Sequence, residues 1–109
     1  MRLAIARAAA LATCTAGSAL ADLVDTPACR IDLAAANALI QRIANREKQF
    51  VAGNLALNCR LLRQNLDDMI KARDPMDRCV TGHDHEENLG QIDASIGDIR
   101  AVLADKCQK

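Results

Sequence analysis

Two histidines and three carboxylates stand side by side in the sequence and form its most reactive cluster. They are His83, Asp84, His85, Glu86 and Glu87. Imidazole nitrogens and carboxylate oxygens bind zinc and copper, so His83, His85 and Glu86 are candidate metal ligands. A metal site needs several ligands that converge in space, and sequence neighbours rarely all point inward. We therefore predict no cofactor and keep zinc or copper binding as the alternative.

Residues 79–84 read Cys-Val-Thr-Gly-His-Asp, which resembles the Cys and His-Asp signature of small disulfide-bonded helical phospholipases A2. The resemblance implies a hydrolase in which His83 is the base for an attacking water and Asp84 is a calcium ligand. It covers six residues, without the glycine-rich calcium loop and the following aromatic residues of those enzymes. The chain also has no Cys-x-x-Cys, phosphate-binding glycine loop or nucleophile elbow. We therefore predict a non-enzymatic protein.

The first 21 residues have the features of an export signal. Arg2 and Arg7 supply a basic start, and an apolar run covers residues 8–16. The small residues Ala19 and Ala21 stand at the two positions that signal peptidase reads before the expected cleavage point after Ala21. The alternative to this cleaved signal peptide is a lipoprotein signal with a lipid anchor at Cys14, but Thr13 fits the lipoprotein motif poorly. No later stretch predicts a transmembrane segment. We expect a bacterial protein that is periplasmic or secreted.

Four cysteines lie beyond the signal, at Cys29, Cys59, Cys79 and Cys107. They are too far apart for a metal knuckle, and an even number in a short exported chain is typical of disulfides. A small core with one aromatic residue, Phe50, also needs covalent support. The chain has 14 basic and 14 acidic residues and no basic patch with stacking aromatics, so we expect no nucleic-acid partner.

Hydrophobic periodicity predicts three helices within a disulfide-linked domain over residues 32–109. Thr26-Pro27 indicates an extended arm over residues 22–31 before the first helix, over residues 32–50. Gly53-Asn54 separates this helix from a second, over residues 55–73, which Asp74-Pro75 should end. The third helix should begin at Asp84, in a capping box with Glu87, and run to residue 106. The alternative is a long hairpin with one continuous helix from Asp32 to Arg73.

Three helices with short connections should run up, down and up as a small all-α bundle. In that topology Cys29 and Cys79 lie at one end, and Cys59 and Cys107 lie toward the other. We therefore predict the disulfides Cys29–Cys79 and Cys59–Cys107 among the three possible pairings.

Small residues form a stripe on the predicted third helix, well separated from its Leu/Ile stripe. The stripe contains Gly90, Ala94, Gly97 and Ala101. Two glycines inside a helix cost roughly 2 kcal/mol, and close approach of a partner helix would be one reason to keep them. An alanine-rich exposed face is the other explanation.

These features together predict a non-enzymatic exported protein that acts through protein–protein interaction, as an inhibitor, chaperone-like factor or accessory subunit. Its partner is another protein or, through the third helix, a second copy. Metal binding by the histidine cluster is the alternative function.

Overall fold

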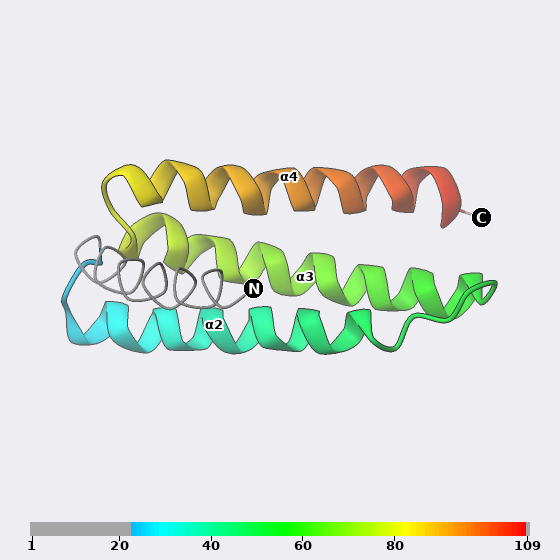
Figure 1. Ribbon diagram of the computed structural model, residues 1–109, viewed down its shortest axis with the longest axis horizontal. Helices are drawn as coiled ribbons and strands as arrows, with labels where there is room; N and C mark the ends of the chain where they lie inside the picture. Colours follow the sequence, from blue (N-terminus) through cyan, green and yellow to red (C-terminus); the bar gives the residue numbers. More distant parts are fainter. Residues whose placement is uncertain (1–22, 109) are drawn as a thin grey trace, which may run out of the picture.

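The computed structural model describes residues 23–108, which form three long helices (Figure 1). They are α2 (Pro27–Glu47), α3 (Leu55–Cys79) and α4 (His83–Lys106), and they run up, down and up. The middle helix, α3, lies between the other two and packs on both, whereas α2 and α4 form no comparable interface. The predicted all-α fold is therefore confirmed. The proposed signal peptide, its cleavage site and Cys14 lie outside the described residues.

The first helix begins at Pro27, so the predicted extended arm is wrong from that residue onward. Thr26 is extended, as expected for a residue before proline, but its Oγ1 accepts a hydrogen bond from the Cys29 amide at 3.1 Å. Proline is well tolerated at the first helical position, because the amide proton that it lacks would have no partner inside the helix. Thr26-Pro27 is thus a helix start.

The break after α2 lies where Gly53-Asn54 predicts it, which rules out a continuous helix. The helix ends at Glu47 and not at Phe50, and Gly53 adopts a positive φ of 82°. The Asn54 side chain then caps α3 by accepting from the Leu57 amide at 3.1 Å. Glycine reaches this backbone conformation without a Cβ penalty.

The prediction that Asp74-Pro75 ends the second helix is wrong, because α3 continues through Pro75 to Cys79. Proline inside a helix removes one backbone hydrogen bond and costs about 3 kcal/mol. Tertiary bonds hold this last part of the helix. Cys79 is bonded to Cys29, and Arg78 forms an ion pair with Asp32 of α2 at 3.2 Å. Within α3, Arg78 also forms an i,i+4 pair with Asp74 at 3.0 Å.

The predicted capping box at Asp84 and Glu87 is also wrong. Helix α4 begins one residue earlier, at His83, with Gly82 at the N-cap and a φ of 71°. Asp84 therefore lies inside the first turn, where it cannot act as the cap. Asp84 and Glu86 still place negative charge at the positive end of the helix dipole.

Both predicted disulfides are confirmed. Cys29–Cys79 joins the start of α2 to the end of α3, with a Cα–Cα distance of 5.4 Å. Cys59–Cys107 joins α3 to the end of α4, with a Cα–Cα distance of 5.8 Å. All four cysteines are buried. The two bonds therefore tie both outer helices to α3, one at each end of the molecule.

The core between the cross-links is thin and aliphatic. Its buried centre is Ala36, Ala72, Ile92 and Ile96, one or two residues from each helix. Partly buried hydrophobic residues surround it: Leu39, Leu66, Met69, Met76 and Leu89. This small group of side chains covers only part of the apolar surface of each helix. Much of the apolar surface near it therefore stays exposed to solvent.

Candidate functional site

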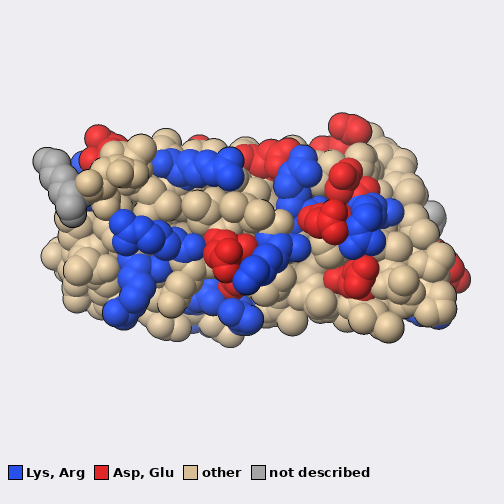
Figure 2. All heavy atoms as spheres, turned by 180° about the vertical axis from the view of Figure 1, so that it is seen from behind, with Lys and Arg blue, Asp and Glu red and all other residues tan. Residues whose placement is uncertain are grey.

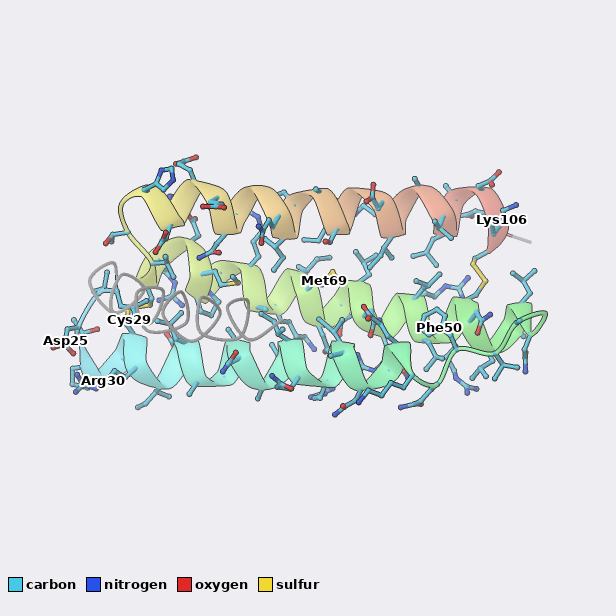
Figure 3. The ribbon with its side chains drawn as sticks, in the orientation of Figure 1. Asp25, Cys29, Arg30, Phe50, Met69 and Lys106 are labelled. Atoms are coloured by element: carbon cyan, nitrogen blue, oxygen red, sulfur yellow. A yellow bond between two sulfur atoms is a disulfide. The ribbon has the colours of Figure 1, made fainter. Side chains whose placement is uncertain are left out.

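A long hollow follows α3 on the side where α2 and α4 flank it. The best-formed part is a cavity of about 450 Å³, to which all three helices and the segment after α2 contribute. Figure 3 shows Met69 between α3 and α4, and Phe50 beside α3. The cavity is lined by Glu47, Phe50, Leu62, Asn65, Met69, Ser95, Asp98 and Ile99.

Two neighbouring cavities extend this hollow toward the other end of the molecule. A cavity of about 170 Å³ shares Met69 and Ser95 with the first, and one of about 540 Å³ shares Ile40 and Met76 with the second. We call the three together the furrow. Its further lining residues are Leu23, Leu33, Ala34, Ala36, Asn37, Ile43, Gln91 and Ile92.

The furrow is built from helical stripes that the sequence contains. Leu62, Asn65, Met69 and Met76 repeat on α3 at steps of three, four and seven residues, and so lie on one side of that helix. The hydrophobic stripes of α2 and α4 are wider than their contacts with α3 can cover. The uncovered edges become the furrow walls, and Ile40 for example stays 37% exposed.

The walls of the 450 Å³ cavity carry one carboxylate each, Glu47 from α2 and Asp98 from α4. Both residues are exposed. Within residues 23–108 neither forms an ion pair, although Asp32, Asp68, Asp74 and Asp93 pair with arginines. The furrow therefore combines an apolar floor with two uncompensated negative charges.

A buried polar network lies beside the furrow, between α2 and α3. Arg46 donates to Asn65 Oδ1 at 3.0 Å, and its Nη1 lies 2.6 Å from Asp68 Oδ2. That close approach is an ion pair without hydrogen-bond alignment, since no aligned donor reaches Asp68 Oδ2. Asp68 is only 3% exposed. Its neighbour Asp67 lies on the surface and forms an i,i+4 ion pair with Lys71 at 2.9 Å.

The structure separates the two histidines of the predicted metal cluster. His83 is 92% exposed and lies 3.9 Å from Glu87. His85 instead packs between Asp77 of α3, at 2.9 Å, and Glu86, at 3.2 Å. Across the described part of the chain, no three His, Cys, Asp or Glu side chains are grouped in a way that could hold a metal ion.

The hydrogen bond that His85 donates to Asp77 raises the pKa of His85, and the bond to Glu86 adds to this effect. Both partners stabilise the protonated imidazole, while partial burial works against it. Asp77 was not among the candidate site residues, because only the continuation of α3 past Pro75 brings it to His85. The pair links the end of α3 to the start of α4.

The small-residue stripe on α4 faces solvent. Gly90, Ala94, Gly97 and Ala101 are all exposed, and a Cβ added at either glycine would meet nothing within 4 Å. Packing within the described residues therefore does not explain these glycines. Partner binding through the stripe stays a prediction.

The face opposite to that of Figure 1 is polar and its charges are segregated (Figure 2). Lys and Arg gather toward the end that holds the α2–α3 connection and the C-terminus, and Asp and Glu gather toward the other end. This separation follows the positions of the charges along the helices: Arg42, Arg46, Arg60 and Arg63 lie toward the α2–α3 connection, and Asp74, Asp77, Glu86 and Glu87 lie toward the α3–α4 connection. Helices α3 and α4 are joined by the bidentate pair between Arg73 and Asp93, at 2.5 and 3.0 Å.

Comparison with protein families, curated proteins and solved structures finds no match for this chain. Among residues 23–108, no helix has both the length and the hydrophobicity needed to cross a membrane.

Proposed function

We propose that this protein is a non-enzymatic, exported helical protein that binds another polypeptide in the furrow between α2 and α4. The observation that carries the proposal is the furrow itself, an open apolar trough on a scaffold cross-linked at both ends. Peptide-binding grooves of this kind receive the apolar side of a helix or an extended segment. An inhibitor, chaperone-like or accessory role would each use such a surface.

The side chains on the furrow floor suit binding of a protein segment. Met69 and Met76 are flexible and polarisable, so they adapt to side chains of different shape. Phe50, the only aromatic residue of the chain, lines the 450 Å³ cavity, and aromatic anchors often dominate binding energy at interfaces. Both features support recognition of an apolar segment.

Export is the second part of the proposal and rests on two supports. The first 21 residues match the pattern of a signal peptide, and the chain is held by two disulfides, which form in oxidising compartments. We place the protein in the periplasm or outside the cell.

Site-specific photo-crosslinking tests the furrow as the binding surface. A photoreactive benzoyl-phenylalanine at Ser95, inside the furrow, should form a discrete adduct with a polypeptide of the cell envelope. The same group at Gln64, an exposed α3 position outside the furrow cavities, should form none. Equal adducts from both positions would reject the furrow.

Binding of the identified polypeptide completes this test. Tryptophan at position 95 should fill the furrow, so Ser95→Trp should weaken binding at least about tenfold. Gln64→Trp adds the same side chain elsewhere and should leave the affinity unchanged. Equal affinities of the two variants would show that the captured polypeptide binds another surface.

Metal binding through His83, His85 and Glu86 is a second hypothesis with less support, because His85 already bonds Asp77 and Glu86. Isothermal titration of the purified protein with zinc and with copper separates it from the first proposal. A saturable heat that His85→Ala removes would support metal binding, and the absence of such a heat would reject it.

A further inference from the structure

We propose that the furrow binds a cationic amphipathic helix, whose apolar stripe lies on α3 while Lys or Arg side chains at both edges of the stripe meet Glu47 and Asp98. This inference rests on the proposed function, since it names the chemistry of the polypeptide that the furrow receives. It is carried by two observations: the length of the furrow, and the charge of its walls.

The length of the furrow fits a helix several turns long. Its α2 wall extends from Leu33 to Glu47 and its shorter α4 wall from Gln91 to Ile99, and its three cavities share lining residues from one to the next. A helix laid between α2 and α4 would contact both and would convert three helices into a four-helix arrangement. It would also cover Ile40, which the present packing leaves 37% exposed.

The charge of the furrow selects a cationic partner. Glu47 and Asp98 stand on opposite walls of the 450 Å³ cavity, and neither forms an ion pair within the described residues. No Lys or Arg of the described chain lines any of the three furrow cavities. A partner with cations on both sides of an apolar stripe would neutralise both carboxylates as it covers the floor.

The same charges disfavour a second copy in the furrow through its exposed α4 face. Helix α4 is itself acidic, with Asp84, Glu86, Glu87, Asp93, Asp98 and Asp105 against Arg100 and Lys106. Placing it between Glu47 and Asp98 would bring like charges together, and like charges across an interface oppose association. The furrow therefore fits a different, basic polypeptide better than it fits α4.

Two model peptides of about 18 residues, roughly five helical turns, provide the probes. Both carry the same leucine stripe, with lysines on the polar side of one and glutamates on that of the other. Each is labelled with fluorescein and titrated with the purified, oxidised protein in about 150 mM salt. This salt concentration screens interactions between distant exposed charges, so that charges in close contact contribute most. Anisotropy should show that the lysine peptide binds at least about tenfold more tightly than the glutamate peptide.

Two matched double variants then test the furrow carboxylates. Glu47→Gln with Asp98→Asn should weaken binding of the lysine peptide about tenfold, a few-fold for each exposed ion pair lost. Glu87→Gln with Asp105→Asn changes the net charge equally outside the furrow, so the dissociation constant should stay within about twofold of the wild-type value. All four side chains are exposed, and unchanged melting temperatures confirm the fold.

The outcomes separate this inference from the proposed function. If the two peptides bind equally, or if both double variants behave alike, the cationic partner is wrong. If Ser95→Trp weakens peptide binding in that case as well, the furrow remains the binding surface, but it does not select a cationic partner. If neither peptide binds at millimolar concentration, the inference fails, and the cross-linking comparison of positions 95 and 64 decides separately whether the furrow binds a polypeptide.

Discussion

Asp68 is a charged residue in an otherwise aliphatic contact between α2 and α3. Its carboxylate is nearly inaccessible to water and depends on Arg46, which is itself only 13% exposed, with Arg42 farther away at 3.5 Å. A buried pair adds little net stability compared with a hydrophobic pair, but loss of one partner leaves the other charge uncompensated. The network therefore constrains how α2 lies on α3 beside the furrow.

We predict that Asp68→Ala lowers the free energy of unfolding by about 3 kcal/mol, because it leaves Arg46 buried without its counterion. Asp67→Ala is the control, since the neighbouring carboxylate is 64% exposed and pairs only with Lys71. That variant should lose less than about 0.5 kcal/mol. Urea denaturation of both variants measures the difference, and similar losses would contradict the assignment of Asp68 to a buried pair.

His85 makes stability depend on pH. Its pKa is raised in the folded protein by the hydrogen bond to Asp77, above the ordinary value of about 6.5 that the unfolded chain retains. The folded state thus holds the proton more tightly. The stabilisation is complete below the unfolded pKa and is lost as the pH rises through the folded pKa.

We therefore expect His85 to contribute more to stability near pH 5.5 than near pH 8. Urea unfolding at both pH values should show this as a difference that Asp77→Asn reduces, because the substitution removes the main cause of the shift. His85→Gln should reduce it as well. The same pH dependence in wild type and both variants would rule out the Asp77–His85 pair as its source.

At the scale of the helices, the last turn of α3 is held by tertiary bonds against its local preference. Pro75 interrupts the backbone hydrogen bonds, yet the helix continues to Cys79 because the disulfide and the Arg78–Asp32 ion pair hold it in place. This continuation also brings Asp77 to His85. The free-energy cost of Pro75 inside α3 is thus offset by the contacts that the last turn of this helix makes with α2 and α4.

We predict that Pro75→Ala raises the free energy of unfolding by about 1–2 kcal/mol, since it restores a helical hydrogen bond but gives the unfolded chain more freedom. Pro27→Ala is the control, because Pro27 stands at the first helical position, where proline is well suited. That variant should be neutral or slightly less stable. Thermal melts compare the two, and destabilisation by Pro75→Ala would show that the helix is not strained there.

At the scale of the whole molecule, two cross-links compensate for a thin core. The bonded cysteines are 50 and 48 residues apart in sequence, and loops of this length predict about 4 kcal/mol of stabilisation each in the chain-entropy description. Small domains have a net stability of about 5–15 kcal/mol. Loss of both bonds therefore removes a large part of what holds the helices together.

We predict that reduction with dithiothreitol unfolds the protein at physiological temperature, measured as loss of helical circular dichroism. The Cys59→Ala with Cys107→Ala variant keeps one bond and should show an intermediate melting temperature. Since Cys59–Cys107 ties α4 to α3, amide exchange should rise first in α4. An unchanged melting temperature after complete reduction would contradict the role given to the disulfides.

The parts of the fold that sequence could predict depend on local pattern and chain topology. Periodic Leu, Ile and Ala residues place the helices, and Gly53-Asn54 places the break between α2 and α3. Alternating helix direction then sorts the cysteines into pairs. The histidine cluster shows the limit, because adjacency in sequence did not bring His83 and His85 to one point.

The sequence by itself thus determined the helices, their order and the two disulfides, because periodicity, turn residues and connection length are properties of the chain read locally. Only the tertiary structure decided that α3 passes through Pro75, that Asp68 is buried while Asp67 is not, and that α2 and α4 stand on either side of an open furrow. Each of these depends on contacts between helices, whose energies exceed local preferences and are not encoded in any single stretch of sequence.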